Sequence, residues 1–195
     1  MSKAHRVWLH KIERNACDLL TMEGFDDRFL LHRGEALADS WPGDVVMDMN
    51  PDHPTDMRLV DSLFNIHALL VVSERLGAFL SDQNIAYLEL LPVGIRDHKG
   101  KRIDADYRIV NLSQHADCLD ASASGAQASL VPGKVRAVER LELKRDALPE
   151  NDALFRLAGF GIPTVVSTKL TQKIDAEGFS GIRWGALADF TDSTW

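Results

Sequence analysis

Cysteines are scarce in this sequence. Only two occur in 195 residues, Cys17 and Cys118, and they stand far apart. Zinc sites need ligands at close, regular spacing, and disulfide-rich folds need several cysteine pairs. A chain of this length buries about 70% of its unfolded surface, so it needs neither device to fold. We therefore expect two reduced, partly buried thiols, as in a cytosolic protein.

Positive charge is also in short supply. The chain has 22 Lys and Arg residues against 29 Asp and Glu, a formal net charge of −7. Nucleic-acid binding depends on neutralising phosphates with Lys and Arg. We therefore expect neither nucleic acid nor an anionic membrane as a partner. An acidic surface does attract basic proteins, although a net charge of this size is also common where it serves only solubility.

No apolar run is long enough to cross a membrane. The longest covers only residues 68–72, whereas a transmembrane helix needs about 20 apolar residues. The first residues, Met1 to Arg6, lead into no apolar stretch of the kind found in a signal peptide. The expected location is the cytoplasm.

Motifs of known catalytic and cofactor sites are missing as well. Ser73 and Ser167 lack the flanking glycines of a nucleophile elbow. Gly159 and Gly161 could begin a dinucleotide-binding turn, but the third glycine does not follow. The histidines are scattered, without the i, i+4 spacing of a helical zinc site. The sequence therefore predicts no catalytic, cofactor-binding or metal-binding residue, although catalytic groups also assemble in space from distant positions.

One short segment resembles half of a calcium-binding loop. Asp48, Asn50 and Asp52 have the spacing of its first three ligands. Such a loop then needs a glycine and a bidentate glutamate, but His53 and Leu59 stand at those places. We interpret the segment as a solvated acidic loop.

A short sequence motif occurs twice in the chain. Residues 71–76 read VVSERL and residues 165–170 read VVSTKL. Paired valines suit a buried strand, the serine that follows is a good helix cap, and apolar residues at i, i+3 and i+4 form a stripe. Asn84 and Gly178 stand where each helix should end, and both tolerate a left-handed conformation. We predict two strand–helix–strand units with Ser73 and Ser167 as helix caps.

The rest of the sequence indicates short strands joined by turns. We expect strands near residues 7–12, 29–31, 45–47, 107–110, 141–144 and 154–157, a short helix over 55–64, and a mobile loop at 121–126. No stretch reads as a linker between domains. The prediction is one α+β domain over residues 1–195, with a mixed, largely antiparallel sheet, short helices and the two strand–helix–strand units. The main alternative is a two-lobe arrangement with one unit in each half.

The most acidic stretch of the chain covers residues 48–61. Pro51 and Pro54 exclude regular structure from its middle. Binding residues concentrate in exposed loops of this kind. Our candidate residues for contact with a basic partner are Asp48, Asp52, Asp56 and Asp61.

A set of short motifs in a fixed order resembles a known family. The motifs are residues 59–61, 71–76, 91–93, 107–111, 117–120, 154–157, 165–167 and 178–182. Their order and spacing over about residues 40–187 resemble a bacterial family first catalogued as a domain of unknown function. That family was later assigned, from gene neighbourhood, as an immunity-protein domain of polymorphic toxin systems. The resemblance implies a cytoplasmic antidote that binds a cognate toxin domain, without catalytic residues. It does not identify the toxin.

The sequence is compatible with three functions. The first is a toxin-neutralising immunity protein that acts by steric occlusion and charge complementarity. The second is an enzyme of unrecognised type, with a pocket between the two strand–helix–strand units. Converging His, Asp or Glu groups of shifted pKa in a deep pocket would support it. The third is a structural or self-associating protein, which a large exposed apolar patch would favour.

Overall fold

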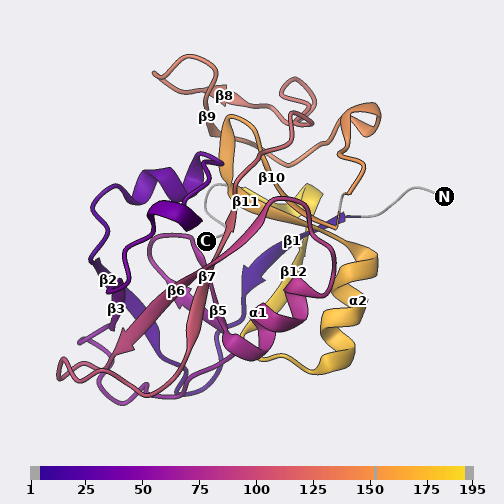
Figure 1. The fold of residues 1–195 in the computed structure, drawn as a ribbon. Helices are drawn as coiled ribbons and strands as arrows, with labels where there is room; N and C mark the ends of the chain where they lie inside the picture. Colours follow the sequence, from indigo (N-terminus) through magenta and orange to yellow (C-terminus); the bar gives the residue numbers. More distant parts are fainter. Residues whose placement is uncertain (1–4, 152, 192–195) are drawn as a thin grey trace.

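A computed structural model describes residues 5–151 and 153–191 of the chain. In this part the fold consists mainly of strands, with two short α-helices. Six strands close a barrel, four form a separate sheet, and two form a hairpin (Figure 1). The α+β fold with mixed and antiparallel sheets is therefore confirmed. No helix in the described part of the chain has the length and apolar character needed to cross a membrane.

The barrel has the strand order β2-β3-β6-β7-β5-β4. Its strands are β2 (Asp18–Glu23), β3 (Val46–Met49), β4 (Ser62–Asn65), β5 (Leu70–Ser73), β6 (Leu88–Arg96) and β7 (Tyr107–Leu112). The pairs β2–β4 and β3–β6 are parallel, and the other pairs are antiparallel. Alternate side chains fill the interior, among them Leu19, Met47, Leu63, Val71, Ile95 and Ile109.

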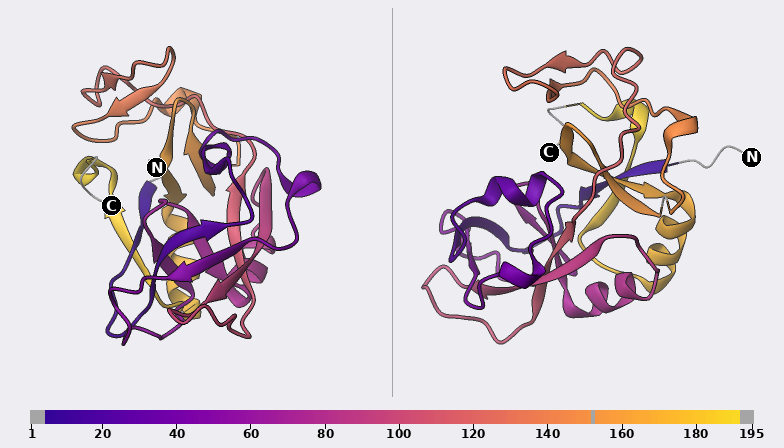
Figure 2. Two further views of the ribbon diagram at one scale, coloured as in Figure 1. Left: turned by 90° about the vertical axis from the view of Figure 1, so that its left-hand side faces the viewer. Right: turned by 45° about the horizontal axis from the view of Figure 1, so that its top comes forward.

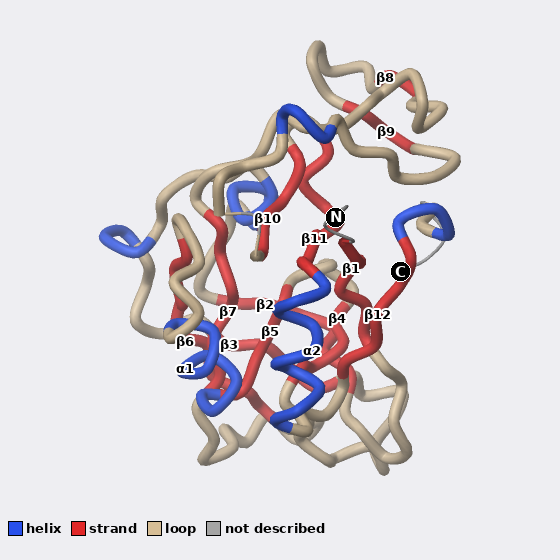
Figure 3. The backbone as a smooth tube through the Cα atoms, turned by 90° about the vertical axis from the view of Figure 1, so that its right-hand side faces the viewer, coloured by secondary structure: helices blue, strands red, loops and turns tan. Residues whose placement is uncertain are grey.

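The four-stranded sheet has the order β10-β11-β1-β12 and is antiparallel. Its strands are β1 (His5–His10), β10 (Leu154–Leu157), β11 (Phe160–Ser167) and β12 (Ile182–Ala186). The helices α1 (Glu74–Ser81) and α2 (Thr168–Glu177) lie side by side (Figures 1 and 3). Both helices share a core with this sheet and with the outward face of the barrel, formed by Trp8, Val72, Leu76, Val110, Leu170 and Ile174.

Both predicted helix caps are confirmed. The Ser73 hydroxyl accepts a hydrogen bond from the Leu76 N–H at 3.3 Å, and the Ser167 hydroxyl accepts one from the Leu170 N–H at 3.3 Å. Each bond satisfies a backbone donor that the helix itself leaves free.

The two predicted strand–helix–strand segments have a similar local arrangement. β5 and β6 lie on either side of the antiparallel strand β7, and β11 and β12 lie on either side of β1. The positions after the helices are left-handed, with φ of 51° at Asn84 and 68° at Gly178. That the two segments are copies of one repeat stays a prediction.

Two segments near the N-terminal half differ from their prediction. Residues Arg28–His32 form a 3-10 helix and not a strand, because the barrel closes without them and leaves no edge to pair with. Residues 55–64 do not form a helix. Ser62–Asn65 is the strand β4, paired with both β2 and β5, so tertiary pairing overrides the weak helical spacing.

Residues 141–144 are not a strand either. They make a single isolated bridge, between Leu119 and Leu143. The N–H of Leu141 binds the Leu187 carbonyl at 3.0 Å, and the N–H of Glu142 binds the Ser124 hydroxyl at 3.0 Å. Both backbone donors bond to groups outside any strand, so no β-ladder forms here.

A hairpin of β8 (Gln127–Ala128) and β9 (Val135–Ala137) stands off from the barrel (Figure 2). Residues 121–126, before it, fold into turns held by backbone bonds such as Ala126 N–H to Ala121 carbonyl, 2.9 Å. Their mobility stays a prediction.

Cys17 and Cys118 are both free and buried, as expected. Burial raises the pKa of Cys17 to about 12 and that of Cys118 to about 11. Both are therefore thiols at neutral pH and poor nucleophiles.

Candidate partner-binding surface

The acidic loop, residues 48–61, begins in the last residues of β3 and continues through consecutive turns to β4. The His53 N–H donates to the Asn50 carbonyl at 3.1 Å, and the Asp56 N–H donates to the His53 carbonyl at 2.9 Å. The Arg58 N–H then binds the Asn15 carbonyl at 2.8 Å. The loop is thus fixed to the segment between β1 and β2, and its four candidate aspartates lie in different surroundings.

Asp48 is bound within the protein. Arg96 donates to both of its oxygens, from Nε at 2.5 Å and from Nη2 at 2.9 Å, and the Thr21 hydroxyl donates at 2.5 Å. The bonds from Arg96, aided by Thr21, hold the pKa of Asp48 below its usual value despite partial burial. The carboxylate already has a cation, so a partner would have to displace Arg96 to reach it.

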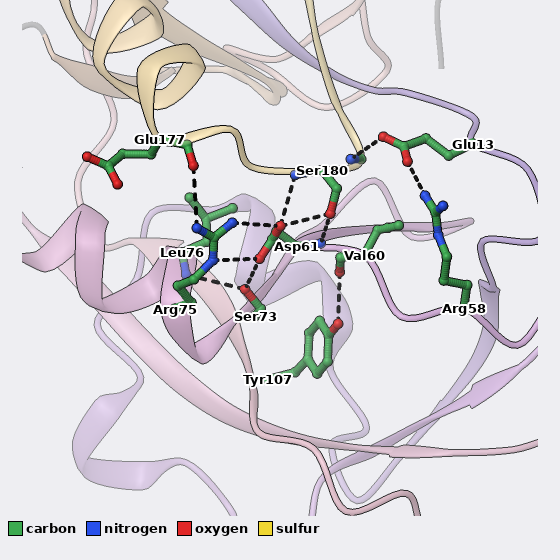
Figure 4. Close-up of polar contacts among 11 residues, drawn as sticks. Glu13, Arg58, Val60, Asp61, Ser73, Arg75, Leu76, Tyr107, Glu177 and Ser180 are labelled. Atoms are coloured by element: carbon green, nitrogen blue, oxygen red, sulfur yellow. Dashed lines mark hydrogen bonds and ion pairs between the residues drawn. The ribbon is translucent and has the colours of Figure 1, made fainter.

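Asp61 joins distant parts of the chain (Figure 4). The Ser180 N–H and hydroxyl donate to its Oδ2 at 2.9 and 2.8 Å. The Ser73 hydroxyl donates to Oδ1 at 2.8 Å, and Arg75 Nη2 donates to Oδ2 at 3.2 Å. Burial by itself raises the pKa of this carboxyl, but the donors outweigh it and lower the pKa to about 2. Asp61 therefore connects the start of α1 to the turn before β12.

Asp52 and Asp56 are the candidates whose carboxylates are left available. Asp52 is exposed and Asp56 is partly exposed. Within the described residues neither side chain forms an ion pair or a side-chain hydrogen bond. Asp56 lines a hollow of about 200 Å³ together with Asp18 and His53, which we name the acidic hollow. The structure thus brings Asp56 to Asp18, which the sequence did not connect with the loop.

Two acidic residues before the loop belong to the same surface. Asp18, in β2, accepts hydrogen bonds from Asn50 at 2.8 Å and from His53 Nδ1 at 3.1 Å. The bond to Asp18 raises the pKa of His53. Glu13 forms an ion pair with Arg58. Sequence reasoning missed both carboxylates, because the pairing of β2 with β3 brings Asp18 to the loop and the bridge between Ala16 and Arg58 brings Glu13 there.

The calcium-like segment is an internal turn. The Asn50 Oδ1 accepts the N–H of Asp52 at 3.1 Å and its amide nitrogen donates to Asp18, while Asp48 is paired with Arg96. Throughout residues 5–151 and 153–191, no three His, Cys, Asp or Glu side chains gather in a way that could hold a metal ion.

A larger hollow of about 440 Å³ lies between the barrel side and the strand β10. It contains His115 and Glu150, with Tyr87 and Asn151 at its wall. Burial, followed by the charge of Arg156, lowers the pKa of His115 to about 4. The described lining includes no serine, cysteine or lysine that could act as a nucleophile beside this histidine. The enzyme hypothesis thus has a cavity but no catalytic set in the described lining.

Comparison with known families decides the broad identity. A family model described as the immunity protein family Imm11 matches residues 14–189. The chain belongs to this family. A comparison with curated proteins found no match.

Membership in the Imm11 family implies, in general terms, a toxin as the partner. The match confirms the resemblance seen in the sequence and extends it towards the N-terminus, from about residue 40 to residue 14. The added part includes β2 and Asp18, which support the acidic loop. These residues therefore belong to the family region together with the loop.

Proposed function

We propose that this Imm11-family protein binds a cognate toxin domain in the cytoplasm and neutralises it by covering a surface that the toxin needs. The family match over residues 14–189 carries this proposal. Occlusion requires affinity and shape but no chemical step, so the proposal assigns no catalytic residue and no cofactor.

The charge distribution supports a basic toxin surface as the target. The net charge is −7, and Asp52 and Asp56 carry carboxylates without an ion pair among the described residues. Asp48 and Asp61, in contrast, hold the ends of the loop through Arg96 and Arg75. Opposite charges across an interface accelerate association and orient the partners.

The first test is neutralisation of the protein encoded by the adjacent gene. Co-expression with this chain should protect cells from that product, and the two should co-purify. A stable complex of this kind typically buries about 1,600 Å². The proposal fails if the neighbour is no toxin and no co-expressed neighbour is bound or neutralised.

A second test distinguishes a specific effect of the acidic loop from an effect of the protein's overall net charge. The pair Asp52→Lys and Asp56→Lys should slow association with the toxin by about tenfold or more at low salt. The difference should shrink as salt is added, because ions screen exposed charges. The control pair, Asp39→Lys and Asp146→Lys, changes the charge equally at exposed positions on other elements. Equal slowing by both pairs would remove the loop from the proposal.

A further inference from the structure

Three large apolar side chains are exposed beside the acidic hollow. Ile12, after β1, is 94% exposed, Phe64 in β4 is 36% exposed, and Ile66, after β4, is 58% exposed. All three line one cavity of about 350 Å³. We name the three side chains the apolar strip and the cavity the apolar hollow. Single exposed apolar residues are common, but a contiguous group around a cavity is typical of an interaction site.

The apolar side chains of Phe64 and Ile66 do not contribute to the barrel core. Along β4 successive side chains point to opposite faces, and Leu63 packs in the barrel core. Asn65 is buried and donates to the Leu69 carbonyl at 2.8 Å. Phe64 and Ile66 alternate with these two and face outward. Sequence reasoning missed the strip because it placed Phe64 on a helix.

His10 lies against Phe64 and lines the apolar hollow. The two rings meet edge to face, with centroids 5.7 Å apart. Burial lowers the pKa of His10 to about 4, although the nearby Leu69 backbone favours the protonated ring. The imidazole is therefore neutral at pH 7, and neither ring nitrogen makes a well-formed hydrogen bond to the described residues. The neutral ring therefore adds to the apolar wall of the hollow beside Phe64.

The apolar hollow adjoins the acidic hollow. Ile12 and Phe64 line both, and the parallel pairing of β2 with β4 sets Asp18 beside Phe64. A segment that enters the apolar hollow therefore passes close to Asp18 and Asp56.

The charges around the strip leave a negative excess for a partner. Lys11 and Arg58 share Glu13, so this carboxylate offsets one of the two cations, and Asp18 in the same hollow offsets the other. Asp52 and Asp56 have no such pair in the described part of the chain. At the other rim, an arginine of β12 (Arg183) donates to a backbone carbonyl at 3.0 Å. A fitting occupant thus carries positive charge on the side of Asp56.

We propose that the toxin places an apolar side chain in the apolar hollow and an adjacent lysine or arginine against Asp56 and Asp52. This inference rests on the proposed function and names the contact that anchors it. An apolar anchor in a cavity, bordered by a charge pair at the rim, is the usual arrangement of an interface hot spot. The partner chemistry is therefore a basic segment with one large apolar residue.

Ile12→Asp and Ile66→Asp test the anchor, with Leu130→Asp as the matched control. Leu130, in the β8–β9 hairpin, is 104% exposed, so the same change adds the same charge at a distant apolar position. Calorimetric titration with the purified toxin measures affinity, and thermal unfolding checks that each variant is folded. We expect affinity to fall by about tenfold or more for both strip variants and to stay within about threefold for the control.

The possible outcomes test the proposed apolar contact separately from the proposed toxin-neutralising function. A wild-type protein that does not bind the toxin contradicts the proposed function. A wild-type protein that binds it, with undiminished affinity in both strip variants, overturns only the anchor. Loss of affinity in Leu130→Asp alone would assign binding to the hairpin, which also overturns the proposal. So would a wild-type dimer that Ile66→Asp dissociates while toxin affinity stays unchanged.

Discussion

Asp61 and Ser180 form three hydrogen bonds with each other across 119 residues of sequence. The Asp61 N–H donates to the Ser180 hydroxyl oxygen at 3.0 Å, while the Ser180 N–H and hydroxyl donate to the Asp61 carboxylate. The Ser62 N–H adds a bond to the Ser180 carbonyl at 3.1 Å. The pair fastens the start of β4 in the barrel to the turn before β12 in the four-stranded sheet.

Asp61→Asn should lower the free energy of unfolding by about 2 to 3 kcal/mol. The change removes the charge that faces Arg75 and sets an amide N–H₂ against the Ser73 or Ser180 donors. The Asp61 side chain is only 16% exposed, so water does not replace the lost bonds. Urea unfolding measures the effect. Asp56→Asn, in the same loop, is the control and should change stability by about 0.5 kcal/mol or less; similar losses in both variants would contradict this role of Asp61.

The sequence predicts the Ser73 helix cap but not the hydrogen bonds of Asp61. The Ser73 cap depends on Leu76, three residues away, so a short window of sequence contains its whole cause. The main donors to Asp61 are 12 and 119 residues away. No repeating pattern in the sequence indicates a contact between residues so far apart. From the sequence, Asp61 is therefore interpreted only as an acidic loop residue.

The candidate partner-binding surface likewise has residues that the local sequence indicates and residues that only the fold brings together. Asp52 and Asp56 follow from prolines and acidic composition, which are local features. The apolar strip depends on the parallel pairing of β2 with β4, which outweighs the helical spacing of Phe64. Ile12 reaches the strip because β1 ends at His10, whose ring contacts Phe64. Pairing between distant strands therefore determines which apolar side chains are exposed at this surface, and local sequence patterns do not.

Ser167→Ala should cost about 1 kcal/mol of stability through loss of the α2 cap. Ser73→Ala should cost more, because its hydroxyl also donates to Asp61 at 2.8 Å. Thermal unfolding compares the two, with Ser167→Thr as a control that keeps a capping oxygen. Toxin affinity should not change in either alanine variant. A specific loss of binding in a stable variant would show that these serines act at the interface.

Acid should weaken the fold between about pH 7 and pH 4. Burial lowers the pKa of His10 from 6.5 to about 4, and burial together with the charge of Arg156 does the same for His32. Between these values the unfolded chain binds more protons than the folded one. Stability is therefore complete above the unfolded pKa and is lost as pH falls towards the folded pKa. A shift of this size corresponds to about 3 kcal/mol for each histidine.

The matched variants for this pH dependence are His32→Gln and His53→Gln, compared by urea unfolding at several pH values. His32→Gln should flatten the fall in stability. His53 is exposed and its pKa is raised by Asp18, so its contribution is present at low pH and lost as pH rises. His53→Gln should therefore leave the acid loss in place. An unchanged slope in His32→Gln would show that His32 is not buried in its neutral form.

Gly181→Ala should destabilise the protein much more than Gly100→Ala. Both glycines have a left-handed backbone, with φ of 78° and 77°, which costs any L-residue about 1 to 2 kcal/mol. A Cβ at Gly100 meets no atom within 4 Å, whereas a Cβ at Gly181 would collide with the Ser62 carbonyl oxygen. Because that collision separates Ser62 from Ser180, we expect a total loss of about 3 kcal/mol or more for Gly181→Ala. Urea unfolding of the two variants measures the difference. Equal losses would mean that the turn before β12 yields freely, and that the contact between barrel and sheet at Asp61 and Ser180 contributes little to stability.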